Sequence, residues 1–150
     1  MAKSPVELER EGLTLKRAGK FKEAIDCFIE LNERFPTWEH GLGQYQIAEC
    51  YAEIGDFSNA ARHYEAALDI EPCNSIWLAG YASFLYLHGD PKQSFDLHLK
   101  MIELERKGAD SAWVNNCITA MITLGKRLQL SEAEVRSLAA KALNGSGGSK

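Results

Sequence analysis

The feature that most constrains the fold is a pattern of small, large and turn-forming residues that recurs every 34 to 36 positions. The first copy reads Leu8, Gly12, Leu15, Gly19, Phe21, Ala24, Phe28, Leu31 and Pro36. The second reads Gln44, Ala48, Tyr51, Gly55, Phe57, Ala60, Tyr64, Ala67 and Pro72. A third copy begins at Leu78 and weakens in its second half, and a fourth begins at Val114 and fades after Gly125. A period of this length indicates stacked helical hairpins.

The chemistry of the repeated positions indicates a helix, a turn and a second helix in each copy. A small residue lets two helices approach closely, and a large apolar residue three positions later lies on the same face. A glycine then ends the first helix, where a left-handed cap favours it, and a proline follows the second helix in two copies. These positions hold Gly12, Leu15, Gly19 and Pro36, then Ala48, Tyr51, Gly55 and Pro72, then Ala82, Leu85 and Gly89.

The pattern predicts helices over 5–18, 21–34, 41–54, 57–70, 75–88, 91–106, 111–127 and 132–143. Ser131 and Glu134 fit a capping box at the start of the last helix. That helix carries charged residues on one face and apolar residues on the other, as expected of a terminal unit that covers the end of a stack. The Gly- and Ser-rich tail 144–150 is expected to be flexible.

The repeat resembles that of the tetratricopeptide repeat (TPR) family, in which helix, turn and helix span about 34 residues. The resemblance covers residues 5 to about 125 and is best in the second copy. It implies an all-α superhelix, a right-handed array of antiparallel helix pairs in a single domain, 5–143. The implied repeats are 5–38, 41–74, 75–108 and a degenerate capping hairpin at 111–143.

By the same resemblance, the expected function is to bind a peptide or helix of a partner protein in a concave groove, as an adaptor or chaperone-like module. The alternatives are a self-associating structural scaffold or assembly factor, and a chaperone of the secretion-system type. No enzymatic activity is expected, because the sequence has no phosphate loop, no nucleophile elbow and no histidine pair at metal-binding spacing. No cofactor or metal is expected either.

Charge and composition exclude some classes of partner and indicate a location. The net charge is −4, which offers no footprint for nucleic acid. No apolar run approaches the roughly 20 residues that span a bilayer, and no signal-peptide core is present, so we expect a cytoplasmic protein. The four cysteines form no C-x-x-C pair, and Cys73 in a predicted turn is the one expected to be exposed. His98 replaces an aromatic residue of the repeat and is expected to pack in the core.

The implied groove is lined by the first helix of each hairpin. Helical projection places Val6, Glu9, Arg10, Leu13 and Arg17 on the ligand-facing side of the first of these helices. Across all four helices, the residues predicted to bind a peptide are Leu13, Leu42, Tyr45, Gln46, Glu49, Ile76, Ala79, Gly80, Ser83, Tyr86, Asn115, Asn116, Thr119 and Ile122. Several of these are large and apolar, and exposed apolar surface usually marks a partner.

Three details of this face suggest what it binds. Tyr45 and Tyr86 are expected to bracket the small residues Ala79, Gly80 and Ser83 as walls of a pocket for an apolar side chain, with the amides of Asn115 and Asn116 close to the peptide backbone. Residues 36–75 hold one basic and seven acidic residues, which favours a basic ligand or is simply a solvated face. The positions that grip a terminal carboxylate in some TPR co-chaperones hold Glu9, Leu13, Gln46, Ile76 and Gly80, so that grip is not expected. Trp38, Trp77 and Trp113 near the helix starts serve either packing between repeats or ligand contact.

Overall fold

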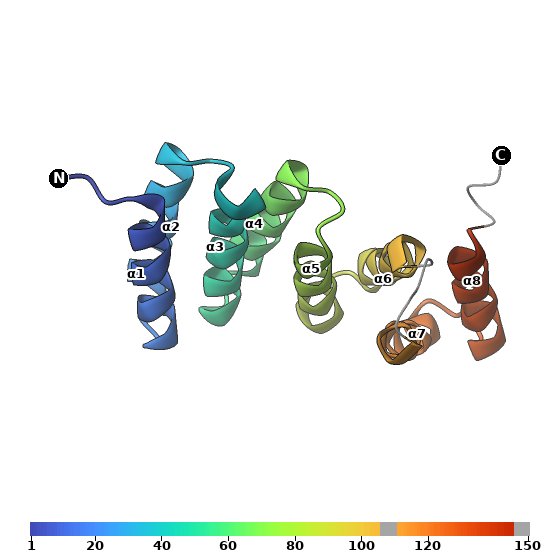
Figure 1. Cartoon of the computed structure of the whole chain (residues 1–150). Coiled ribbons are helices and arrows are strands. Elements are labelled where there is room, and N and C mark those ends of the chain that lie inside the picture. The colour runs from blue at the N-terminus through green and yellow to red at the C-terminus, as the bar shows by residue number, and fades with distance from the viewer. Residues whose placement is uncertain (106–110, 146–150) are drawn as a thin grey trace. The chain divides into compact units, whose positions relative to one another are not determined.

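A computed structural model describes residues 1–105 and 111–145, and all regular secondary structure in these ranges is helical (Figure 1). The helices are α1 (Pro5–Arg17), α2 (Phe21–Arg34), the 3₁₀ helix η1 (Trp38–His40), α3 (Leu42–Glu53), α4 (Phe57–Ile70), α5 (Ser75–His88), α6 (Pro91–Glu105), α7 (Ser111–Arg127) and α8 (Glu132–Asn144). Successive α-helices form antiparallel pairs, so the predicted all-α fold of paired helices is confirmed.

The helix ends agree with the sequence-based ranges to within one residue wherever the structure describes them. The short helix η1 was not predicted. It forms where Glu39 and His40 adopt positive φ angles of 46° and 60° in the connection between α2 and α3. Asn144, predicted as the first residue of the tail, belongs to α8, and Gly145 caps that helix in the left-handed conformation. The ends of the predicted third repeat and of the tail lie outside the described residues.

The chain divides into two compact units, residues 1–77 and 78–150, with the division inside α5. The handedness of the array and the extent of a single domain over 5–143 therefore stay predictions.

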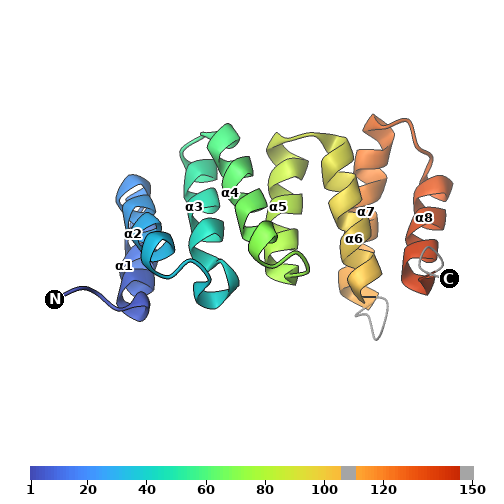
Figure 2. The same cartoon turned by 90° about the horizontal axis from the view of Figure 1, so that it is seen from above.

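In the N-terminal unit, α2 packs against both α1 and α3, and α3 packs against α4 (Figure 2). The core between these helices is formed by Leu8, Ala24, Ile25, Phe28, Leu31, Ile47 and Cys50. Phe28 is fully buried, and a Cβ atom at Gly12 would lie only 2.6 Å from Cζ of its ring. The expectation that Gly12 is small because two helices approach closely is thus confirmed.

The glycines that end the first helices divide into two kinds. Gly19 and Gly55 have φ angles of 77° and 81°, which confirms the predicted left-handed caps. Gly89 is not in that conformation, so the same prediction was wrong for the third copy. A Cβ atom there would lie 2.4 Å from Cδ2 of Leu85 and 3.0 Å from its Cα, so close packing against Leu85 is what excludes a side chain.

In the C-terminal unit, α6 packs against α7 and α8, and α7 packs against α8. The predicted capping box is confirmed: the Glu134 amide donates to Oγ of Ser131 at 3.1 Å, and the Ser131 amide donates to the Glu134 carboxylate at 2.7 Å. This backbone hydrogen bond lowers the pKa of Glu134. The buried residues of α8 are Val135, Ala139 and Ala142, and its other face is exposed, as expected of a capping helix.

The cysteines follow the expectation from the repeat. Cys50 and Cys117 are buried, and burial raises the pKa of each thiol to about 11, whereas Cys73 is exposed. Within the described residues, no helix combines the length and apolar character needed to cross a bilayer.

Candidate binding surfaces

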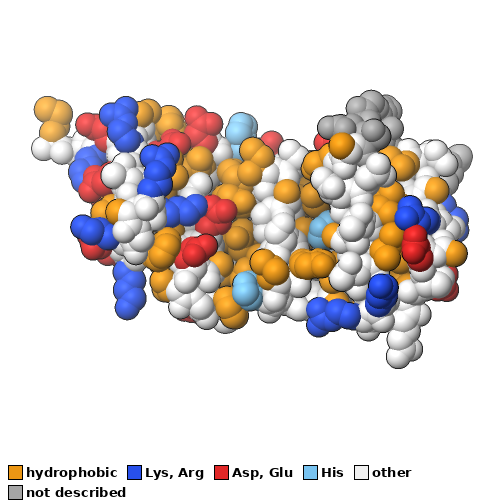
Figure 3. Space-filling model, turned by 90° about the horizontal axis from the view of Figure 1, so that it is seen from below, with side chains coloured by type: hydrophobic (Ala, Val, Ile, Leu, Met, Phe, Trp, Pro, Cys, Tyr) orange, Lys and Arg blue, Asp and Glu red, His pale blue; other side chains and the backbone are white. Residues whose placement is uncertain are grey.

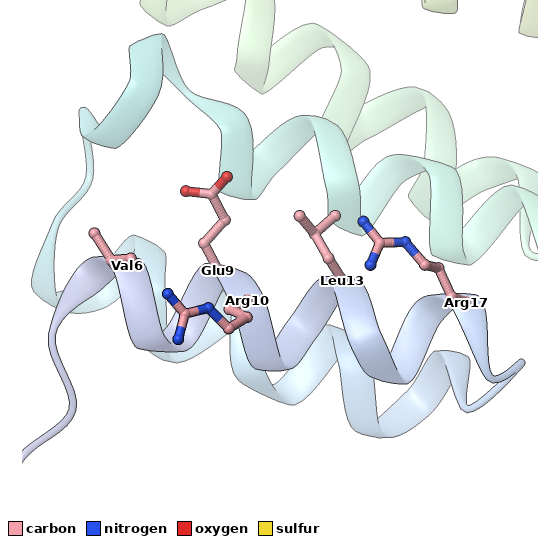
Figure 4. Close-up of a pocket in the computed structure, with 5 residues that line it drawn as sticks. All are labelled: Val6, Glu9, Arg10, Leu13 and Arg17. Carbon is pink, nitrogen blue, oxygen red and sulfur yellow. The ribbon is translucent and has the colours of Figure 1, made fainter.

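A pocket on the surface of α1 is lined by Val6, Glu9, Arg10, Leu13 and Arg17 and encloses about 210 Å³. These are the five residues that helical projection placed on the ligand-facing side of this helix. Figure 4 shows Glu9, Leu13 and Arg17 extending from the same side of α1, toward α3. Residues spaced three or four apart share one face of a helix, so one helix supplies the whole lining.

The charged side chains of this pocket differ in whether they already have a partner within the protein. The carboxylate of Glu9 accepts a hydrogen bond from Nε1 of Trp38 at 2.8 Å, so it is already engaged. Arg10 and Arg17 are exposed, and neither guanidinium forms an ion pair with any residue that the structure describes. Two free guanidinium groups therefore flank the apolar side chain of Leu13.

A second polar contact joins α1 to α3. Nζ of Lys16 donates to Oε1 of Gln46 at 2.8 Å and also forms an ion pair with Glu49. Gln46 and Glu49 were predicted as ligand contacts, but Lys16 was not part of that prediction. On the face of the N-terminal unit drawn in Figure 3, acidic and basic side chains lie intermixed. The acidic surplus of residues 36–75 is thus partly balanced by basic groups from α1.

Tyr45 corrects an expectation. Its side chain is 8% exposed, its ring stacks on Trp77 with the ring centroids 4.5 Å apart, and it meets Tyr64 edge-on at 5.6 Å. Burial raises the pKa of Tyr45. The indole of Trp77 in turn donates to the His40 carbonyl oxygen at 2.9 Å, so this tryptophan packs between repeats. Tyr45 is therefore a core residue and not an exposed pocket wall.

The C-terminal unit contains an open surface cavity with a volume of about 270 Å³, lined by Ser83, Tyr86, Leu87, His98 and Ala120. Ser83 and Tyr86 were predicted to line a pocket, whereas His98 and Ala120 were not. His98 is 8% exposed, as expected of a packed residue, and it is also one of the residues that line the cavity.

Comparison with known proteins assigns the repeat. The tetratricopeptide repeat family matches residues 43–73, which cover α3, α4 and the turn after them. Residues 43–73 form a TPR repeat. This match falls on the second copy of the repeat, where the sequence pattern is most complete, and its two helices pack against each other as a TPR hairpin requires.

The chain is also similar to a much larger protein. It is 30% identical over 96 residues to the transcription factor tau 131 kDa subunit of Saccharomyces cerevisiae. The aligned region covers 64% of this chain and 9% of that protein, so the chain spans a small part of its relative. TPR domains are generally protein–protein interaction modules and typically have no catalytic activity.

The other residues predicted to contact a bound peptide differ in how exposed their side chains are. Ile76 is 62% exposed, and Asn115, Asn116 and Thr119 are exposed on α7. Leu42, Ala79, Gly80 and Ile122 are half-buried, and Leu42 also packs against the core of the N-terminal unit. Tyr45 and Tyr86 belong to different units, and because Tyr45 is buried in the core of its own unit, it is not available as a wall of the pocket predicted between them. The described residues contain no group of three or more His, Cys, Asp or Glu side chains placed to hold a metal ion.

Proposed function

We propose that this chain is an adaptor or chaperone-like module that binds a peptide or helix of a partner protein along its first helices. The observation that carries the proposal is the pocket on α1. Its five lining residues are those that the repeat pattern assigns to the ligand-facing side, and a pocket exists there. Val6 is 47% exposed at one end of this surface, and Leu13 is only partly buried where it packs against the core.

The side chains of the pocket suggest the chemistry of the ligand. Leu13 and Val6 offer apolar contact, and the guanidinium groups of Arg10 and Arg17 lie on either side of Leu13 along α1. Seven residues correspond to about 10.5 Å along a helix, so carboxylates of a bound segment can reach both arginines while an apolar side chain between them covers Leu13. The favoured ligand is therefore a segment with an apolar residue flanked by Asp or Glu.

This mode of binding differs from the grip on a terminal carboxylate that some TPR co-chaperones use. The positions of that grip on α1 hold Glu9 and Leu13, as predicted, and Glu9 is bonded to Trp38. Positive charge comes from Arg10 and Arg17, which occupy other places on the helix. The similarity to a subunit of a transcription factor supports a role inside an assembly of proteins. A cytoplasmic location remains part of the proposal.

Selection from a library of short random peptides tests the proposal. Peptides enriched on the wild-type chain should contain Leu, Ile or Phe between acidic residues, because this pattern matches the pocket. Val6→Glu places a carboxylate at the pocket edge and should weaken binding of the enriched peptides about tenfold. Ile29→Glu is the matched control, since Ile29 is 38% exposed on α2 and lies outside the pocket. Equal weakening by both variants, or enrichment of basic peptides, would contradict the proposed ligand.

A further inference from the structure

One of the residues that line the cavity of the C-terminal unit, His98, has a side-chain nitrogen with no hydrogen-bond partner among the described residues. The lining of the cavity comes from α5, α6 and α7, and the exposed Leu87 stands at its edge with 70% of its surface accessible. The other members are the hydroxyl-bearing Ser83 and Tyr86, the methyl group of Ala120 and the imidazole of His98. Of these five side chains, only that of His98 is more than nine-tenths buried and titratable near neutral pH.

The hydrogen bonds of His98 fix its tautomer. Nδ1 lies 2.8 Å from the backbone carbonyl oxygen of Ser94. A carbonyl oxygen can only accept, so Nδ1 carries the hydrogen and donates it. The Ser94 hydroxyl is itself committed, because it donates to the Ala82 carbonyl oxygen at 2.9 Å. In the neutral ring, Nε2 is then left with a lone pair and is a hydrogen-bond acceptor.

Nε2 has no partner among the described residues. It is also not sealed inside the protein, since no fully buried side-chain nitrogen or oxygen in the described part of the chain lacks a hydrogen bond. The cavity is the space that His98 borders. His98 therefore brings an unpaired acceptor that is not fully buried to the lining of a mainly apolar cavity, and a ligand with one donor would satisfy it.

We propose that this cavity binds an indole ring, the side chain of a tryptophan on the partner protein, whose N–H donates to Nε2 of His98. The inference rests on the proposed function, in which the partner is a protein segment, and it names one side chain of that segment. It also assigns a binding role to His98, which the repeat pattern places in the core.

Size and hydrogen bonding both favour indole. An apolar cavity of about 150 Å³ accommodates benzene, so about 270 Å³ has room for a two-ring system. The indole nitrogen is a donor only, and one acceptor satisfies it completely. A phenol also has lone pairs that need donors of their own. The ring of Tyr86, which is half-buried at the cavity, provides an aromatic surface for a flat ligand.

Protonation of His98 would place a hydrogen on Nε2, which could then no longer accept the indole N–H, so binding requires the neutral ring. Burial lowers the pKa of His98, which keeps the ring neutral at pH 7 and above. The lone pair of Nε2 is consequently available under ordinary conditions.

The test is an NMR titration of the full, ¹⁵N-labelled chain with free indole and with indene, which has the same shape but no N–H group. Indole should bind with millimolar or tighter affinity, at least about fivefold more tightly than indene, as one added hydrogen bond implies. The Nε2 resonance of His98 should move with indole and stay in place with indene. Neither compound needs the α1 pocket, so this result and that of the peptide selection are independent.

Two variants and one control complete the design. Ser83→Trp should abolish indole binding by filling the cavity from its exposed edge, and His98→Phe should make indole and indene bind equally. His63→Phe is the control, because His63 is a half-buried histidine of the N-terminal unit that lies 2.7 Å from the Gln44 side chain and borders no part of this cavity. Equal binding of indole and indene to the wild-type chain, tighter binding of phenol than of indole, or no binding of any of them would each overturn the proposal.

Discussion

Replacing Phe28 with alanine is expected to lower the free energy of unfolding of the N-terminal unit by about 3–5 kcal/mol. The ring is fully buried among α1, α2 and α3, so its loss removes apolar contacts and leaves a cavity. Ile29 is the matched control on the same helix. It is 38% exposed, and Ile29→Ala should cost about 1 kcal/mol or less. Urea unfolding followed by circular dichroism measures both.

A double-mutant cycle with Gly12 makes this prediction more specific. In the wild-type chain, Gly12→Ala should be destabilising because the new Cβ atom would lie 2.6 Å from the Phe28 ring. In the Phe28→Ala background, the new methyl group at position 12 would enter the space left by the ring. Gly12→Ala should then leave the free energy of unfolding unchanged or raise it, since alanine has a higher helix propensity than glycine. Additive effects of the two substitutions would contradict the close approach of α1 and α2 at this point.

Reversing both arginines of the α1 pocket is expected to have the second large effect. The double variant Arg10→Glu/Arg17→Glu should weaken binding of a selected acidic peptide by about tenfold or more, because two attractions become repulsions. Calorimetric titration measures the change. Binding to the wild-type chain should also weaken as salt is raised, since both guanidinium groups are exposed and are screened by ions.

The control for net charge is Lys20→Glu/Lys22→Glu. It changes the charge of the chain by the same amount at exposed positions that do not line the pocket, and should alter affinity little. A peptide with lysines in place of its acidic residues should bind the reversed variant better than the wild-type chain. If the control weakens binding as much as the arginine variant, the attraction is a property of the whole surface and not of this pocket.

The fold and the set of residues that share one face of α1 could be predicted from the sequence for the same physical reason. Both depend on the helical period, which determines where Gly12 meets another helix and which side of α1 carries Leu13. Left-handed caps at Gly19 and Gly55 follow from local backbone preferences. None of these features requires knowledge of how distant side chains meet.

Two of the differences arose where side chains of different helices meet, and one arose at the end of α5. Tyr45 lies on the predicted face of its own helix, but Trp77, 32 positions later, covers its ring. Lys16 reaches across to Gln46 and Glu49 from another repeat, and no local pattern indicates that pairing. Gly89 occupies the repeat's glycine position for a different reason, its approach to Leu85.

The central claim is that the ligand-facing side of α1 binds a segment of a partner protein. Chemical-shift mapping of a selected acidic peptide on the ¹⁵N-labelled chain tests it most directly. We predict that the largest shifts fall on the amides of Val6, Arg10, Leu13 and Arg17, while the amide of Ile29 on α2 stays nearly unchanged. Largest shifts on the exposed face of α2, with the α1 amides unchanged, would contradict the account.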